Sequence, residues 1–247
     1  MDYDGLLELA KERRTRREFK TDPIPDEYID KIIEVARWAP AGFNTQPWEF
    51  VVIKKTELRD KIVKMVDEYR GSDFFEFEST REPETGAPWQ PDPLGEQREF
   101  ALDNAPVFIL LFGDTRVQRG LPMAVRWNYQ KHETIWHASM ANAFLYMLLA
   151  ANTLDLACCW VSAVQIPLLH CKIKHLLGIP EVYDLHDMMA VGYPAGKVVK
   201  KLMRPREEMV HYDEFNKEEL RTNEQVNDWI RRTRTWVLSE FKRGKKD

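Results

Sequence analysis

Apolar residues along this chain follow two kinds of pattern, which predict helices and strands. From Ile29 to Ala36 they recur at positions i, i+3, i+4 and i+7, the spacing of an amphipathic helix, and Pro25 suits its first turn. Shorter, nearly continuous apolar runs are typical of strands buried in a sheet. We expect strands at about 48–54, 106–113, 156–164 and 186–193, and helices at about 6–10, 25–36, 57–69, 135–153, 167–177 and 217–243.

The apolar segment 135–153 is nearly as long as a membrane-spanning helix. It contains His137, Ser139 and Asn142, however, and a helix that is apolar on most faces also suits the centre of a soluble protein. We therefore interpret it as a buried central helix and expect no contact with a membrane. The acidic N-terminus, which has no apolar stretch behind it, likewise predicts no signal peptide.

Regular patterning is lost between Gly71 and Glu99, and again between Thr115 and Lys131. Long irregular segments are usually functional or disordered, and bulky aromatic side chains argue against simple disorder. For the first segment two interpretations stay open, a lid over an aromatic ligand and a partly ordered surface insertion. Its prolines and aromatic residues are Pro83, Pro88, Pro91, Pro93, Phe74, Phe75, Phe77 and Trp89.

The composition is that of an ordinary globular protein, with 44% hydrophobic and 31% charged residues among 247. A net charge of -4 gives no general attraction to nucleic acid. The adjacent Cys158 and Cys159 and the distant Cys171 have neither the spacing of a metal site nor that of a disulfide framework. We expect a reduced, cytoplasmic environment, no bound metal and no nucleic-acid partner.

The segment Trp38–Phe50 joins the amphipathic helix to the first strand and carries much of the candidate chemistry. Pro40 and Gly42 break the helix. The amides of Asn44 and Gln46 can donate and accept hydrogen bonds at once, which suits a planar heterocycle with mixed edges. They can equally cap nearby backbone, so the residues alone leave both interpretations open.

A second polar segment, Arg13–Arg17, has four arginines and a threonine in five positions. Guanidinium groups form bidentate, charge-assisted hydrogen bonds, so the segment suits a phosphate. A solvated basic face after a helix is one alternative. A nucleic-acid patch is another, but no aromatic residues are interleaved with the arginines to stack on bases.

Together the two segments resemble the FMN-dependent nitroreductase family. Arg13–Phe19 reads R-R-T-R-R-E-F where the family has R-R-S/T-x-R-x-F, and Ala39–Phe50 reads A-P-A-G-F-N-T-Q-P-W-E-F where the family has A-P-S/A-G/S-x-N-x-Q-P-W-x-F. The likeness covers roughly residues 5–215. It implies an α+β fold with a mainly antiparallel sheet of four or five strands enclosed by helices, in an intertwined homodimer with FMN at the interface. We expect a domain of residues 1–216 with an irregular insertion at about 71–99, for which a lid stays one of the two interpretations, and a helical extension at 217–247 that packs on the other subunit.

The resemblance also implies which residues contact the cofactor. The positions that hold the FMN phosphate and reach the pyrimidine edge are Arg13, Arg14, Thr15 and Arg17, joined from the C-terminal tail by Lys201 and Arg204. The loop lying against the flavin contains Pro40, Ala41, Gly42, Asn44 and Gln46, and the segment that crosses the ring near N5 contains Ser162 and Ala163.

Two of these positions depart from the family pattern. Ala41 replaces a serine of many members, which preserves a backbone contact but not a hydroxyl contact. Ser162 replaces a usual glycine. Its N–H would stabilise the charge that builds on the ring during hydride transfer, whereas its hydroxyl would bond N5 and favour one-electron steps. Simple packing is the third interpretation of this serine.

The function implied by the resemblance is an FMN-dependent NAD(P)H oxidoreductase of nitroreductase type. NADH or NADPH would reduce FMN at N5, leave, and be replaced by a small electron-poor acceptor such as a nitroaromatic or a quinone, in a ping-pong scheme. Since the cofactor carries the hard step, we expect no side-chain catalyst. His132 and His137 are candidate proton donors, although a histidine beside a buried helix is more often structural. The alternatives are reductive dehalogenation or flavin cleavage on the same flavin, and a non-enzymatic FMN-binding protein.

Overall fold

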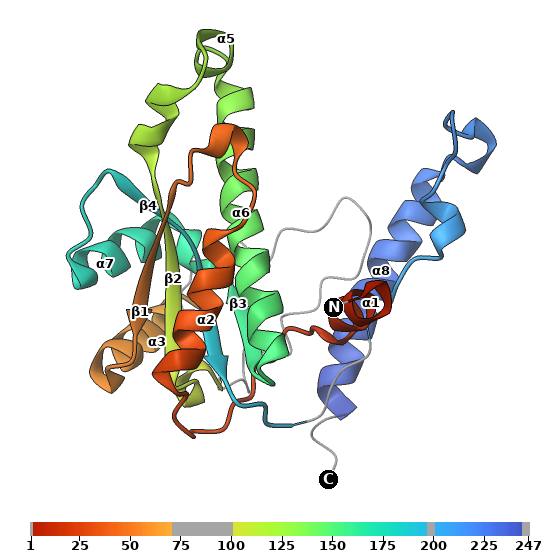
Figure 1. Ribbon diagram of the computed structural model, residues 1–247. Helices are drawn as coiled ribbons and strands as arrows, with labels where there is room; N and C mark the ends of the chain where they lie inside the picture. Colours follow the sequence, from red (N-terminus) through yellow and green to blue (C-terminus); the bar gives the residue numbers. More distant parts are fainter. Residues whose placement is uncertain (1, 71–100, 197–200, 244–247) are drawn as a thin grey trace. The chain divides into compact units, whose positions relative to one another are not determined.

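The computed structural model describes residues 2–70, 101–196 and 201–243 (Figure 1). The predicted lid at about 71–99 therefore lies outside the described residues. Residues 1–69 and 99–195 form one compact unit, and residues 70–98 and 196–247 form a second. Each unit is described by itself, and the predicted domain boundary at residue 216 stays a prediction.

The first unit is built on a four-stranded antiparallel sheet of β1 (Trp48–Ile53), β2 (Val107–Asp114), β3 (Ala157–Val161) and β4 (Tyr183–Gly192). The strand order is β1-β2-β4-β3, so β1 and β3 are the two edges. The central strands β2 and β4 are buried on both faces along most of their length, which explains their continuous apolar sequence. The predicted antiparallel α+β fold is confirmed.

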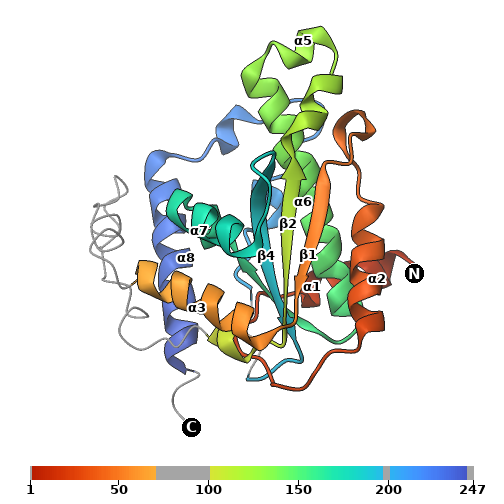
Figure 2. The same cartoon turned by 90° about the vertical axis from the view of Figure 1, so that its left-hand side faces the viewer.

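Helices cover both faces of this sheet (Figures 1 and 2). On one face lie α2 (Asp26–Arg37) and α6 (Tyr129–Thr153), which share a core with Ile109 of β2 and Met189 of β4. On the other face lie α3 (Thr56–Arg70) and α7 (Pro167–Leu177). Ile29, Ile32 and Ala36 are the buried positions of α2, so its predicted amphipathic face is confirmed.

Several predicted boundaries are corrected by the structure. Helix α6 begins at Tyr129 rather than Ile135, because the side chain of Asn128 accepts the Lys131 N–H and caps it earlier. The stretch predicted to be irregular after Thr115 contains a 3-10 helix at Thr115–Gly120 and the short helix α5 (Met123–Arg126). Strand β3 ends at Val161, and Ser162–Gln165 forms a 3-10 turn.

The remaining helices are α1 (Tyr3–Glu12) and, in the second unit, α8 (Asn223–Arg243). Helix α8 begins later than predicted, because Lys217–Glu219 is a separate 3-10 turn. Further 3-10 turns lie at Gly42–Asn44, Ala101–Asn104 and Arg206–Glu208. Within the described ranges, α6 included, no helix is both long and apolar enough to cross a membrane.

Candidate cofactor site

The arginine-rich segment lies along the edge strand β3. Thr15 forms a parallel bridge with Cys158, and the Arg16 N–H donates to the Cys158 carbonyl at 2.8 Å. Further on, the Lys20 N–H donates to the Tyr193 carbonyl at 2.9 Å. The backbone of this segment is therefore held as if it were a short additional strand.

Helix α1 delivers the first two arginines to this edge. The Arg13 N–H donates to the Leu9 carbonyl at 3.0 Å, which ends the helix. The Arg14 guanidinium donates to the carbonyls of Lys11 and, at 2.9 Å, Arg13. These bonds place a cation at the C-terminus of a helix, where it is favoured. Arg14 thus has a role in ending the helix, whereas the predicted cofactor role of Arg13, Arg14, Thr15 and Arg17 stays a prediction.

The two adjacent cysteines are buried residues of this same strand. Burial raises the pKa of the Cys158 thiol well above its ordinary value, Cys159 raises it further, and the nearby Arg13 opposes the shift. A thiol held protonated in this way is a poor nucleophile. Cys158 and Cys159 are accordingly core residues, as their sequence context indicates.

The predicted N5 segment continues from the same edge strand. Ser162 is exposed and Ala163 is half-buried in the 3-10 turn that follows β3. Four residues of strand separate Cys158 from Ser162, or about 13 Å. Between them Trp160 is exposed over 38% of its surface, and its ring lies 4.4 Å from that of Phe144 on α6. The arginine-rich segment and the Ser162 turn therefore lie along one edge of the sheet.

The loop before β1 has a strained backbone. Phe43, Asn44 and Gln46 have φ angles of 54°, 53° and 42°, in the left-handed region that residues other than glycine rarely adopt. Each such residue costs on the order of 1–3 kcal/mol, so the surrounding structure must hold it in place. The amides of Asn44 and Gln46 are exposed, and Gln46 Nε2 donates to Asn44 Oδ1 at 3.0 Å.

Helix α6 holds this loop. The Gly42 N–H donates to Ser139 Oγ at 3.0 Å, and Asn142 Nδ2 donates to the Pro40 carbonyl at 2.9 Å. A Cβ at Gly42 would lie 2.3 Å from Ile135 Cγ2, so only glycine permits this approach. The polar residues Ser139 and Asn142, which argue against a membrane helix in the sequence, thus serve to position the loop.

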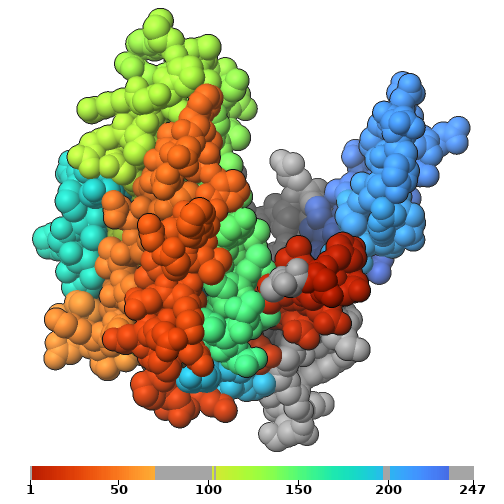
Figure 3. All heavy atoms as spheres, in the orientation of Figure 1, coloured from red at the N-terminus to blue at the C-terminus, as the bar shows by residue number. Residues whose placement is uncertain are grey.

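The structure places the two predicted halves of the site at opposite edges of the sheet. The loop 40–46 leads into β1, and the Pro47 carbonyl accepts the Asp114 N–H of β2 at 2.7 Å. The arginine-rich segment lies on β3, three strand spacings or about 14 Å away across the sheet. In Figure 3 the orange segment that leads into β1 lies beside the upper part of the green α6. One chain therefore does not bring the two halves together at one edge.

The tail residues belong to the second unit. Lys201 is exposed, and Arg204 Nη2 donates to the Glu208 carbonyl at 2.6 Å. Arg204 Nε also lies 3.6 Å from Glu208 Oε2. Because the two units are described separately, the predicted contact of Lys201 and Arg204 with the phosphate stays a prediction.

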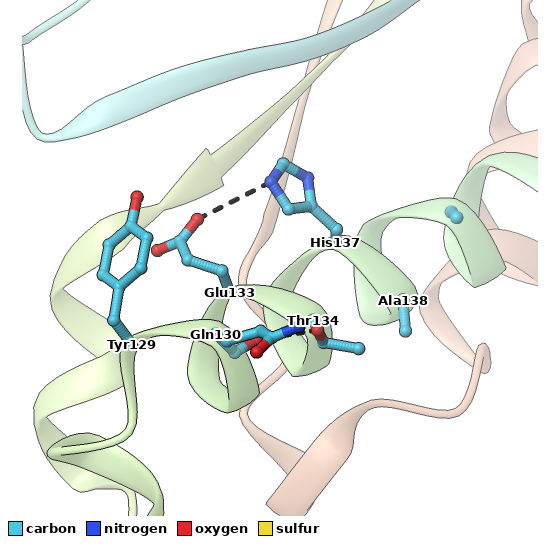
Figure 4. Close-up of a pocket in the computed structure, with 7 residues that line it drawn as sticks. Tyr129, Gln130, Glu133, Thr134, His137 and Ala138 are labelled. Carbon is cyan, nitrogen blue, oxygen red and sulfur yellow. Dashed lines mark hydrogen bonds and ion pairs between the residues drawn. The ribbon is translucent and has the colours of Figure 1, made fainter.

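A hollow of about 620 Å³ lies on α6 and is lined by none of the predicted cofactor residues (Figure 4). His137 Nε2 lies there 3.6 Å from Glu133 Oε2. His132 is more enclosed, with Nε2 3.1 Å from Glu133 Oε1 and Nδ1 3.2 Å from the Arg126 carbonyl. Both ring nitrogens of His132 are thus engaged, which favours its structural interpretation. The lining residues are Tyr129, Gln130, Glu133, Thr134, His137, Ala138 and Ala141.

Sequence reasoning missed a polar group behind the Ser162 turn. It consists of Gln165 in the turn and of His186 and Asp187 in β4, which are 7% and 1% exposed. A signal for it was present, because His186 and Asp187 are polar residues at the start of the apolar run predicted as a strand.

Comparisons with known proteins identify the family. A family model described as the Nitroreductase family matches residues 10–193. The chain belongs to the nitroreductase family. This membership confirms the resemblance in the sequence, and the matched range contains both the β3 edge and the loop before β1.

Relatives of this nitroreductase-family chain include two deiodinases and a flavoprotein of known structure. Iodotyrosine deiodinase 1 of Rattus norvegicus is 31% identical over 210 residues, which cover 83% of this chain and 67% of the rat protein. Iodotyrosine deiodinase of Thermotoga neapolitana is 29% identical over 211 residues, which cover 85% of this chain and 98% of the bacterial protein. A nitroreductase with bound FMN from Bacteroides fragilis shares the fold with a TM-score of 0.60 at 20% identity, covering 86% of this chain and all of the other.

Proposed function

We propose that this protein is an FMN-dependent oxidoreductase that takes hydride from NADH or NADPH and reduces a small electron-poor acceptor, such as a nitroaromatic or a quinone. The observation that carries the proposal is the arginine-rich segment, fixed by backbone bonds along β3 next to the Ser162 turn. Guanidinium groups on a backbone that is already ordered suit a phosphate, since little further ordering is needed on binding. When bound, FMN would supply the hydride chemistry.

The residues of this chain would bind and orient that cofactor. Arg13 and Arg17 would hold the phosphate, and Thr15, which is exposed at the bridge to Cys158, would add a hydroxyl donor. The backbone N–H of Ser162 would point at the part of the ring where negative charge develops. No side-chain acid or base is required by this scheme.

We further propose that the protein acts as a homodimer in which the loop 40–46 of one copy completes the β3 edge of the other. The two halves lie at opposite edges of one sheet, and a two-fold axis is the simplest operation that brings unlike edges of two copies together. Helix α6 offers a contact face, because Tyr129 and Leu145 are 73% and 42% exposed beside the hollow.

An absorption spectrum of the purified protein, followed anaerobically as NADH or NADPH is added, tests the first proposal. Flavin bands that bleach with one of the nucleotides would support it and identify the donor. A yellow protein that neither nucleotide bleaches would contradict the assigned donor but not the site. A protein that stays colourless after incubation with FMN would overturn the proposal as a whole.

Subunit complementation tests the dimer. Arg13→Ala damages the β3 half, and the double variant Asn44→Ala/Gln46→Ala damages the loop half. The assay uses an FMN concentration too low to load either variant alone. If the halves of one site come from different subunits, mixing the two proteins after reversible dissociation would then restore one intact site per mixed dimer. With statistical pairing about half of the dimers are mixed, and each has one of its two sites intact, so about a quarter of the wild-type activity would return. No recovery in confirmed mixed dimers would show that each site lies within one chain.

Reductive dehalogenation is a second candidate, favoured by one residue of this chain. Ser162 stands exposed where the family usually has glycine, and a hydroxyl at this place would favour one-electron steps on the flavin. Two relatives carry the name iodotyrosine deiodinase. Iodide release from iodotyrosine under dithionite, compared between the wild type and Ser162→Gly, tests this candidate. We expect a flavin radical and iodide release with serine and a loss of both with glycine; equal behaviour of the two proteins would eliminate the role of Ser162.

A further inference from the structure

A β-bulge places polar groups behind the turn that follows β3. In the β2–β4 ladder Leu111 faces Asp187 and Phe112 faces Leu185, so His186 is the extra residue of β4. Bulges re-aim side chains and are frequent next to active sites. Here the bulge introduces an imidazole and a carboxyl group directly before the buried apolar run Met188–Val191 of β4.

The turn is joined to this bulge through one side chain. Gln165 Nε2 donates to the His186 carbonyl and, at 3.2 Å, to Asp187 Oδ1. The extra residue of a bulge has a carbonyl that the ladder does not use regularly, so the glutamine amide supplies a partner for it. The same amide also donates to the carboxyl group of Asp187, which is almost fully buried. Loss of a hydrogen bond to a buried polar group is costly.

Asp187 and His186 lie in close contact with each other, and His186 also contacts α6. Asp187 Oδ2 lies 2.8 Å from His186 Nδ1. The His186 ring packs 5.8 Å from the ring of Trp136 and 5.7 Å from that of His137, both on α6. The bulge is therefore braced by α6 and presents Gln165 with a rigid pair of acceptors.

We propose that Gln165 is a positioning residue, which ties the turn Ser162–Gln165 to the β4 bulge and so fixes Ser162 and Ala163 for the flavin. The inference rests on the proposed function. The turn has no side-chain cap at its N-terminal end, where Val161 precedes it. Without the glutamine, the turn would keep its backbone bond from the Ile166 N–H to the Ala163 carbonyl and the packing of buried Val164, but lose its two side-chain hydrogen bonds to β4.

A matched pair of substitutions separates this role from an ordinary structural one. Gln165→Met keeps the length of the side chain and removes both donated bonds. Gln118→Met makes the same replacement at a glutamine that is not among the predicted cofactor residues, and removes one donated bond, from Nε2 to Glu133 Oε1 at 3.3 Å. Asp187→Asn keeps an oxygen acceptor for Gln165 while it removes the carboxylate charge.

The experiment measures the FMN dissociation constant of the full-length protein by fluorescence quenching, the flavin midpoint potential and the melting temperature of the apoprotein. We expect Gln165→Met to weaken FMN binding by about tenfold and to shift the midpoint potential, because the turn is no longer fixed. Gln118→Met should change neither quantity. Asp187→Asn should bind FMN within about threefold of the wild type.

Two results would overturn the inference while FMN binding by the wild type still upholds the proposed function. One is an unchanged affinity and potential in Gln165→Met, with only a lower melting temperature. The other is an affinity loss in Asp187→Asn as large as that in Gln165→Met, which would assign the effect to the charge rather than to the glutamine bond. A wild type that binds no FMN would instead overturn the proposed function, and this inference with it.

Discussion

The two halves of the candidate site are held in different ways. The arginine-rich segment has ordinary extended backbone, fixed by hydrogen bonds to β3 and to the segment after β4, and its chemistry lies in its side chains. The loop 40–46 has three residues in the left-handed region and is fixed by α6, so its chemistry depends on the path of its backbone. We therefore expect side-chain changes in the first half to weaken ligand binding without unfolding, and changes that move the backbone of the second half to lower stability.

The largest effect should come from Gly42→Ala in the loop half. The new Cβ would lie 2.3 Å from Ile135 Cγ2, and overpacking of this kind costs about 1–3 kcal/mol of unfolding free energy. Urea unfolding measures this loss of unfolding free energy. The double variant Gly42→Ala/Ile135→Ala removes the clashing methyl group, so the two changes together should cost less than the sum of the two alone. Simple additivity would show that the close approach to α6 does not restrict the loop.

Arg13→Ala should have the next largest effect, and on binding rather than on folding. Loss of a charged hydrogen-bond donor to a phosphate should weaken FMN binding by about 10- to 100-fold, with little change in the urea midpoint. The control is Arg37→Ala, because Arg37 is an exposed arginine paired with Glu34 on α2. An equal loss of affinity in both variants would mean that the effect is general charge attraction and not a contact in the β3 half.

Asn142→Ala should have a smaller effect, again in the loop half. It removes the hydrogen bond to the Pro40 carbonyl, which we expect to lower the unfolding free energy by about 1 kcal/mol. Asn152→Ala is a matched control at the other end of the same helix, away from the hollow. The proposed difference between the two halves would be wrong if Asn142→Ala weakened FMN binding but had the same unfolding free energy as the control.

The smallest effect should be a pH dependence of stability from His170 on α7, next to the β4 bulge. Burial lowers the pKa of His170 below its ordinary value of 6.5; Lys174 lowers it further, and Asp184 opposes the shift. The unfolded chain therefore binds a proton more readily than the folded one, so stability is lost as the pH falls below about 6.5. His170 Nε2 also accepts the Leu185 N–H at 3.1 Å, next to the bulge, and protonation removes that acceptor. Unfolding free energies measured from pH 8 to pH 5 should fall toward acid pH in the wild type and fall less in His170→Gln.

The elements of the fold were largely predictable, and the errors have local causes. Helix α7 runs from Pro167 to Leu177 as predicted, because proline begins it and Gly178, with φ at 65°, ends it. Helix α6 begins before its predicted start, because its first turns are exposed and carry polar residues that hide the helical period. Strand β3 is shorter than its apolar run, because Val164 is buried in the following turn rather than in the sheet.

The candidate site was predictable in its parts but not in its arrangement. The arginines and the amide loop stand out by residue type, and no tertiary information is needed to connect them with a phosphate and a heterocycle. Their position at opposite edges follows from the strand order, which places β2 and β4 between them. Gln165 could not be assigned a role from the sequence, because its two acceptors belong to β4.

The sequence by itself determined the periodic helices, the apolar strands, the two polar segments and, through them, the family. These features are local, since side-chain periodicity and backbone preference act over a few residues. The tertiary structure alone decided which strands are neighbours, that His186 bulges against β2, and that α6 reaches Gly42 closely enough to exclude any side chain there. Such features depend on contacts between residues far apart in the chain. The residue pattern of one segment does not indicate which other segment will pack against it.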